Sequence, residues 1–392
     1  METMKLVHQH ADEMIAIRRH LHQYPELSNE EFKTTELIKE KLIEYGVEVV
    51  DIGMNTGVLG LLRGGKPGKT VAIREDIDAL PMAELADIPY RSTVENVCHS
   101  CGHDIHTAVL LSAAKALVQV KDELCGNVLF LFQPAEEKGM GAKQFIEKKF
   151  YEVSKPDSFI GLHVSPEYPA GSIGLKRGPA NASNDFFHIK VSGKGGHGAH
   201  PENCIDPIAI SAYIITQLQT VISRENHPVY PAVMTIGAIH AGKAPNIIPD
   251  FVEMSGTLRS LDFASREKMM TAIERITKCG AEALRGSAEI WWEEGMPPLV
   301  NDDDVIERLR TAANETIGAD HIIDVKNPSL GSEDFSCLFP RFAPGAQFRL
   351  GTGNDIDPNT RHGIHNSKNT FDDSCIEAGA GVIVQYARNF LK

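Results

Sequence analysis

The sequence predicts an α/β protein with a mostly parallel central sheet flanked by helices and an inserted α+β domain. Short β-branched apolar runs alternate with helical patterns up to residue 180, and charged residues follow the ends of several runs. The order of elements then changes near residue 180. A chain of 392 residues is also too long for one ordinary core, so we expect two domains.

Before residue 180 the chain is predicted to alternate between helices and strands. An amphipathic helix over residues 4–22 places Met14, Ile17 and Leu21 at helical spacing, and Ser28 begins a second helix that ends near Gly46. Strands are expected over 47–50, 58–62, 70–73, 127–132 and 159–164, and helices over 105–119 and 141–150. Charges directly after such strands lie where open α/β sheets bind ligands.

The inserted domain is predicted over residues 183–295. Its elements are strands over 185–192, 233–240, 251–258 and 288–292, a turn over 193–198, and helices over 206–222 and 263–283. This β-α-β-β-α-β order is that of a ferredoxin-like split unit. Residues 1–182 and 296–392 would form the other domain, completed by helices near 302–316 and 373–391.

Composition excludes several classes of protein. The formal charge is −14 and no basic run occurs, which argues against nucleic-acid binding. No apolar stretch reaches eighteen residues and the N-terminus has no signal-like apolar region, so neither a membrane span nor secretion is expected. Seven scattered cysteines do not form a disulfide framework, so we expect a reduced, cytoplasmic setting in which thiols are available for metal.

Residues 98–107 hold the densest set of potential metal ligands. Cys101 and His103 flank Gly102, and a thiolate and an imidazole two residues apart suit a borderline divalent ion. A buried cysteine with a structural histidine is an alternative interpretation. Cys98 and Cys101 also form a C-x-x-C pair, which leaves a redox role open.

A second cluster follows the predicted strand over 127–132. Glu136 and Glu137 could supply one metal ligand and one general base, although a solvated charge pair at a strand end is common. His163 ends an apolar strand, His197 lies in a glycine-rich turn, and His365 follows Ile364. Each of these histidines taken singly fits a structural role as well as a catalytic one.

The ordered set of motifs resembles the M20 family of metallopeptidases and aminoacylases, and within it the amidohydrolase branch that contains hippurate hydrolases and auxin-conjugate hydrolases. The resemblance includes R-E-D-I-D-A-L-P at 74–81, H-S-C-G-H-D at 99–104 and Q-P-A-E-E at 133–137. Further matching segments are 18–22, 25–28, 195–197, 206–208, 246–249, 256–259 and 331–335, together with His365. Single motifs would be weak, but their series spans nearly the whole chain.

The resemblance implies a zinc-exopeptidase-like catalytic domain and an inserted lid or dimerisation domain. It also implies two divalent ions per subunit, Mn²⁺ or Zn²⁺, held by Cys101, His103, Glu137, His163 and His365, with Cys101 bridging them. Glu136 would be the general acid/base. His197 would steady the oxyanion in the active site of a partner subunit, and Asn246 and Arg259 would hold the carboxylate of the substrate.

The implied function is cleavage of the amide bond of N-acyl amino acids by a metal-bound water, in a homodimer or higher homo-oligomer joined through the inserted domain. A small-peptide carboxypeptidase or dipeptidase of the same family is the alternative, and a zinc-stabilised binding module is the non-enzyme alternative. Three departures from the branch bear on substrate preference: Glu75 in place of alanine, Cys98 in place of methionine, and the 366–371 segment with Ser367 and Asn369.

Overall fold

The computed structural model describes residues 2–339 and 341–392, which form two compact units. Unit 1 contains the chain as far as Gly178, together with Asn301–Lys326 and Cys337–Lys392. Unit 2 contains Pro179–Val300 and Asn327–Ser336. The sequence did not predict the segment Asn327–Ser336 in the second unit. It lies there because Ser329 donates a main-chain hydrogen bond to Ala180 (2.8 Å) and accepts one from Ala182 (3.1 Å).

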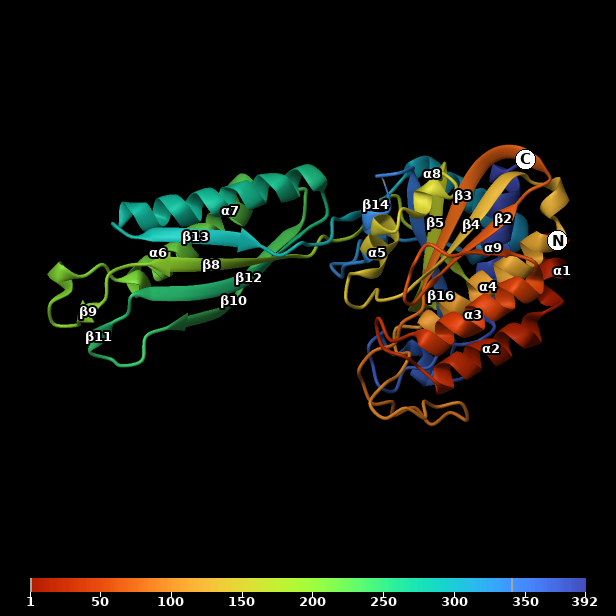
Figure 1. Cartoon of the computed structure of the whole chain (residues 1–392), viewed down its shortest axis with the longest axis horizontal. Coiled ribbons are helices and arrows are strands. Elements are labelled where there is room, and N and C mark those ends of the chain that lie inside the picture. The colour runs from red at the N-terminus through yellow and green to blue at the C-terminus, as the bar shows by residue number, and fades with distance from the viewer. Residues whose placement is uncertain (1, 340) are drawn as a thin grey trace. The chain divides into compact units, whose positions relative to one another are not determined.

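Unit 1 is built on one eight-stranded sheet in the order β1-β2-β4-β3-β5-β16-β6-β15. Figure 1 labels β2, β3, β4, β5 and β16 of this sheet. The strands are β1 (Glu48–Val50), β2 (Val58–Arg63), β3 (Lys66–Asp76), β4 (Cys125–Gln133), β5 (Ser158–Pro169), β6 (Ile173–Leu175), β15 (Ile322–Asp324) and β16 (Gly345–Gly353). The four central strands β4, β3, β5 and β16 are parallel, while β1, β2 and β6 each run antiparallel to a neighbour. The predicted mostly parallel sheet is therefore confirmed.

Helices cover this sheet. They are α1 (Glu2–His8), α2 (Ala11–Gln23), α3 (Phe32–Tyr45), α4 (His103–Gln119), α5 (Gly141–Glu147), α8 (Asp303–Thr316) and α9 (Cys375–Phe390). Helix α4 is buried along nearly its whole length, where it packs on α9 and on strands β3, β4 and β5. Its apolar residues belong to the main core together with Phe130, Ile160 and Phe348 of the sheet. The first turn of α4 is thereby fixed against the strand ends.

Two helix boundaries differ from the prediction because tertiary contacts decide them. The helix expected over 4–22 is two helices, separated at Gln9 and His10, and the ring of His10 is buried against the Ser112 hydroxyl (3.0 Å). Helix α3 begins at Phe32 rather than at Ser28. The Ser28 hydroxyl donates instead to Asp78 (2.7 Å), which lies two residues after the end of β3 and belongs to the candidate site described below.

Strand β16 is the largest element that the sequence did not predict. Its sequence, GAQFRLGTG, has three glycines and no sustained apolar alternation. It nevertheless lies in the middle of the sheet, parallel to β5, with Arg349 opposite His163. The Cβ of any residue other than glycine at position 345 would lie 2.6 Å from the ring of Phe339, so the glycine permits close packing there.

Unit 2 has the predicted β-α-β-β-α-β order and the antiparallel strand order β10-β12-β8-β13 (Figure 1). Its main elements are β8 (Asp185–Ser192), α6 (Pro207–Thr220), β10 (Ala232–Ala241), β12 (Phe251–Ser260), α7 (Phe263–Ala283) and β13 (Ser287–Trp292). Inward residues of β8, such as Phe187 and Ile189, form a second core with Ile214 of α6 and Ile273 of α7. A π-helical turn, Val221–Glu225, extends α6.

Two small sheets complete the chain. Strands β9 (Gly196–His197) and β11 (Ile247–Ile248) pair within unit 2, and β7 (Gly178–Asn181) pairs with β14 (Leu299–Asn301). Among the helices that the described residues form, none combines the length and the apolar character that crossing a bilayer requires.

Candidate metal centre

Donor side chains from four separate segments of unit 1 converge near the end of β4 and the middle of β5. The Cys101 sulfur lies 3.6 Å from Nε2 of His163, and Oε1 of Glu137 lies 3.4 Å from Nε2 of His365. Oε1 of Glu137 is also 3.8 Å from Nε2 of His103. All five residues that the sequence analysis nominated as metal ligands are thus brought together.

Among the groups of described residues whose donor atoms all lie within 4.8 Å of one another, two consist only of predicted ligands, and Glu136 lies in another with His103 and Glu137. Of the two ligand groups, one is Cys101, His103 and His163, and the other is Cys101, Glu137 and His365. The only residue that the two groups share is Cys101. A thiolate common to both is the arrangement expected of a bridging ligand between two cations.

Gly102 allows Cys101 and His103 to stand on either side of the start of α4. It has a left-handed backbone (φ 86°), and a Cβ at this position would lie 2.6 Å from Cγ2 of Val164 and 3.1 Å from the ring of Phe371. Glycine alone meets both demands without strain. The loop can therefore turn tightly enough to present a thiol and an imidazole to the same space.

The turn that carries the two glutamates is held by buried carboxylates. Ala135 has a left-handed backbone (φ 52°), and its N–H donates to Oε1 of Glu31 (2.9 Å). The N–H groups of Glu136 and Glu137 donate to the two oxygens of Asp78 (3.2 and 3.1 Å). The left-handed backbone of Ala135 is strained, because the residue is not a glycine. Such strain persists where neighbouring contacts hold the backbone in place, and it is typical of functional sites.

Asp78 also lies 3.3 Å from Nδ1 of His103, so Nδ1 can donate to its carboxylate and Nε2 is left to face the cluster. The charged stretch 74–81 at a strand end is visible in the sequence, but Asp78 was not among the predicted site residues. The position of Asp78, two residues past a buried strand, does indicate a role in the site. A carboxylate there can either support a metal ligand or bind the metal itself. Only the structure shows which of the two arrangements Asp78 adopts.

His365 differs from the other donors in being exposed. Nearly half of its side chain (49%) is accessible, whereas His103 and Cys101 are buried. Its backbone is left-handed (φ 60°), and its N–H donates to the carbonyl of Ser100 (2.9 Å), which ties the C-terminal loop to the segment before Cys101. His365 therefore marks the side of the cluster that faces solvent.

The protonation chemistry of the cluster fits a divalent cation. Nε2 of His103 and Oε1 of Glu137 are buried and have no hydrogen-bond partner within the part of the chain that the structure describes. Burial raises the pKa of the Cys101 thiol well above the ordinary value of a cysteine. Burial lowers the pKa of His163 well below the ordinary value of a histidine. A neutral imidazole is ready to ligate, and a thiolate at this depth requires a neighbouring cation.

A buried ionic network fixes the start of α4 from the other side. Asp104 pairs with Arg18 (2.9 Å) and accepts from His22 (2.7 Å), and both partners come from α2. Although burial alone would raise the pKa of Asp104, the charges of Arg18 and His22 hold it far below its ordinary range. His22 also contacts Glu84 (3.0 Å). The network explains why the set of matching motifs includes residues 18–22 as well as the distant metal motif, since the two segments are in contact in the fold.

The redox interpretation of Cys98 and Cys101 finds no support in the geometry. Both thiols are free, and Cys98 is in none of the donor groups formed by the described residues. Its main chain pairs with Leu80 in an isolated bridge (3.0 and 3.1 Å). Cys98 is a buried residue of the supporting loop, and it provides a natural control for Cys101.

The three nominated residues of unit 2 fall into two places. His197 of β9 lies opposite Ile247 of β11, and Gly198 donates to the carbonyl of Asn246 (2.9 Å), so His197 and Asn246 are neighbours. Arg259 lies near the C-terminal end of β12, away from the end that follows β11. It donates there to the carbonyl of Leu330 (3.4 Å). Within one chain, unit 2 does not bring Arg259 to His197.

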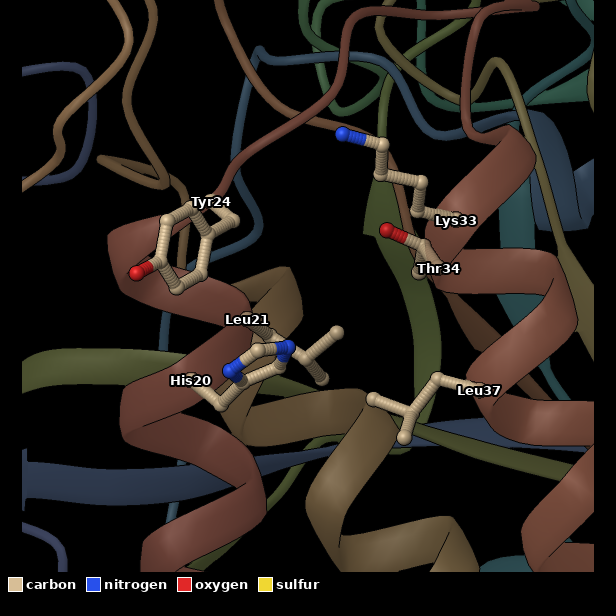
Figure 2. A pocket seen from close by; sticks show the side chains of 6 residues that line it. All are labelled: His20, Leu21, Tyr24, Lys33, Thr34 and Leu37. Atoms are coloured by element: carbon tan, nitrogen blue, oxygen red, sulfur yellow. The ribbon is translucent and has the colours of Figure 1, made fainter.

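A pocket of about 240 Å³ lies between α2 and α3 (Figure 2). Figure 2 shows the six side chains that line it, which are His20, Leu21, Tyr24, Lys33, Thr34 and Leu37. None of them belongs to the donor cluster. The pocket is a separate feature of this helix pair and has no part in the chemistry below.

Comparison with known proteins identifies the family. The sequence pattern of peptidase family M20/M25/M40 matches residues 72–389. The chain belongs to this family. It is therefore a hydrolase of amide bonds, as the motif series predicted.

Relatives of the chain include both deacylases and peptidases. It is 39% identical to the N-acetyl-L-cysteine deacetylase of Bacillus subtilis over 97% of this chain and 88% of that protein. It is 41% identical to thermostable carboxypeptidase 1 of Saccharolobus solfataricus over 94% and 93%. A solved Bacillus subtilis structure, described as a dinuclear metal-binding peptidase of the M20 family, covers 97% of this chain and 98% of its own at 33% identity, with a TM-score of 0.85.

Proposed function

We propose that this M20 hydrolase cleaves the amide bond of N-acyl amino acids with two divalent cations and Glu136 as general acid/base. The observation that carries the proposal is the pair of donor groups that share Cys101, with Glu136 beside them. Glu136 and Glu137 are neighbours on one strained turn, so one carboxylate can ligate while the other handles protons.

Cys101, His103, Glu137, His163 and His365 would hold the two cations, which supply Lewis-acid polarisation of the amide carbonyl and of the attacking water. The name of the dinuclear relative supports two ions. A thiolate with three imidazoles suits Zn²⁺, and Mn²⁺ is the other candidate.

Glu136 would accept the proton of the attacking water and deliver it to the leaving amine nitrogen. Its main chain is held by Asp78, so the carboxylate needs no large reorganisation during the reaction. Nδ1 of His197 accepts from the N–H of Ala199 (3.1 Å), which places the proton of the neutral ring on Nε2. Nε2 can then donate to the developing oxyanion, the role expected for His197.

The proposed substrate has a free carboxylate, which Arg259 of one chain would bind together with Asn246 of the other chain of the dimer proposed below, because Asn246 lies beside His197 and away from Arg259. N-acyl amino acids and dipeptides both present such a group and differ on the other side of the scissile bond. A dipeptide differs in bringing an ammonium group close to the metal site. The N-acetyl-L-cysteine deacetylase relative favours N-acyl amino acids as the first candidate, and the carboxypeptidase relative favours a small-peptide substrate as the second.

A substrate panel tests this proposal. Protein reconstituted with Zn²⁺ or Mn²⁺ is assayed on N-acetyl and N-benzoyl amino acids and on dipeptides with the same C-terminal residue. We expect kcat/KM to be at least about tenfold higher for the N-acyl substrates. The reverse order would favour the peptidase. Unfolding on chelation, without any activity on either set, would favour a metal-stabilised binding module.

We also propose that the protein is a homodimer in which His197 serves the active site of the partner subunit. Supporting this, His197 is exposed and lies away from Arg259 within its own unit. Strand β10 lies at one edge of the sheet that the described residues form, and its side chains Val233 and Ile239 are exposed. An edge strand of this kind accepts another strand readily. Tyr213 and Tyr230 are exposed as well.

Complementation between two inactive variants tests the dimer proposal. His197→Ala and Glu136→Gln chains carrying different tags are co-expressed, and the mixed dimer is purified through both tags. One of its two sites then has every group, so about half of the wild-type activity should return. A mixed dimer of Glu136→Gln and Glu137→Gln chains should stay inactive, because each chain damages its own site. No recovery in the first mixture would contradict action across subunits.

A reducing, cytoplasmic location is proposed on the state of the thiols. All seven cysteines are free, and the proposed bridging role of Cys101 requires a reduced sulfur.

A further inference from the structure

The strand that carries His163 loses its main-chain neighbour just before the ligand. Strand β3 pairs with β5 as far as Arg74 opposite Gly161, while β16 continues to pair on the other side through Ser165. N–H groups two residues apart point to the same side of a strand. The amides of Leu162 and Val164 thus face the side on which β3 pairing has ended, where buried donors need acceptors.

Two buried side chains supply those acceptors. Oε1 of Glu75 accepts from the N–H of Leu162 (2.9 Å), and Nε2 of His106 accepts from the N–H of Val164 (3.0 Å). Both side chains are fully buried. Beyond the end of the β3 pairing, these two side chains therefore accept the hydrogen bonds that a neighbouring strand would otherwise accept. One of them binds the amide before His163 and the other binds the amide after it.

The contacts of His163 and His106 define how both rings are oriented. Nδ1 of His163 donates to the carbonyl of Val164 (2.9 Å), which leaves Nε2 toward Cys101. Nδ1 of His106 donates to Asp76 (2.5 Å). The ring of His106 stacks on His103 (centroids 5.2 Å apart) and lies edge-on to His163 (4.9 Å). His106 touches two proposed ligands while both of its nitrogens are engaged elsewhere.

We propose that Glu75 and His106 are positioning residues that hold the Leu162 and Val164 amides and so place His163 for metal binding. The inference rests on the proposed function, in which His163 is a ligand. Asp76, His103 and His106 also have donor atoms close enough to hold an ion. Because the two nitrogens of His106 already bind Asp76 and Val164, its role is to position the site and not to ligate.

The proposal gives Glu75 a role that the sequence did not predict. From the sequence, this departure from the branch motif was expected to bear on substrate preference. The carboxylate is instead buried against the main chain of β5, where it accepts from Leu162. Glu75 therefore acts on the ligand strand, and we expect changes at this position to alter metal affinity more than the choice of acyl group.

The test uses substitutions that keep one hydrogen bond at a time. His106→Gln retains an acceptor near the position of Nε2 and so keeps the Val164 contact, whereas His106→Asn retains a group near Nδ1 and loses it. Glu75→Gln keeps a carbonyl acceptor for Leu162, and Glu75→Ala removes it. The apparent affinity for Co²⁺ is measured by competition with a chelator, and the number of Co²⁺ ions per chain is measured at saturation.

We expect His106→Asn and Glu75→Ala to weaken Co²⁺ binding about 10- to 100-fold, the usual effect of removing a residue that supports a ligand. Each Gln variant should bind Co²⁺ at least about tenfold more tightly than the other variant at the same position. Every variant should still bind two ions at saturation. Melting temperatures of the metal-free proteins show whether each variant is folded.

Equal affinities within each pair would overturn the positioning role. A fall to one ion per chain in both His106 variants would overturn it as well, since His106 would then be a ligand. Failure of the proposed function is distinguishable through His163→Ala. Two ions bound to that variant with wild-type affinity would remove His163 from the ligand set, whatever Glu75 and His106 do.

Discussion

Replacement of Glu136 by Gln is expected to lower kcat by about 10²–10⁴-fold while the protein still binds two metal ions. Gln keeps the size of the side chain and the main-chain hydrogen bond to Asp78, but it cannot accept a proton from water or return one to the leaving nitrogen. Because the lost step is chemical, KM should change much less than kcat.

The measurement combines steady-state kinetics on the best N-acyl substrate with elemental analysis of the same preparation. Glu137→Gln is the matched control, since the two residues are adjacent and their N–H groups share the carboxylate of Asp78. That variant should lose metal as well as activity, because Glu137, unlike Glu136, shares a donor group with Cys101. Wild-type turnover in Glu136→Gln would end the assignment of the general acid/base.

Replacement of Cys101 by Ser is expected to have the other large effect, loss of both metal ions together with activity. Cys101 belongs to both donor groups, so its substitution weakens two sites at once. A serine hydroxyl is nearly isosteric but stays protonated at neutral pH, and it is a poorer ligand than thiolate for Zn²⁺. We expect fewer than about one ion per chain after dialysis and no measurable turnover.

Cys98→Ser is the control for this substitution. Cys98 is three positions away, equally buried and a free thiol, but it is in none of the donor groups formed by the described residues. It should keep both ions and most of its activity. Equal loss of metal in both variants would indicate a general loosening of the loop, and retention of both ions by Cys101→Ser would exclude a bridging thiolate.

Local patterns in the sequence were sufficient for much of the fold. Alternating buried and exposed positions placed β8 within residues 185–192 and helical spacing placed α7 within residues 263–283, because their side chains are sorted by burial with a regular period. β16 was missed, since a glycine-rich strand buried on both faces carries no such period. The break between α1 and α2 was missed because the buried ring of His10 contacts α4, a contact that no local pattern records.

The sequence by itself determined which chemistry is available: a thiol, imidazoles and paired carboxylates in an order that matches peptidase family M20. Only the tertiary structure decided how these groups are used. In the folded chain, Asp78 and His106 contact and support neighbouring residues. Glu75 is buried against the strand that carries His163, and Arg259 lies away from His197. These outcomes depend on which segments meet at a sheet edge, and contacts between residues far apart in the chain leave no periodic trace in the sequence.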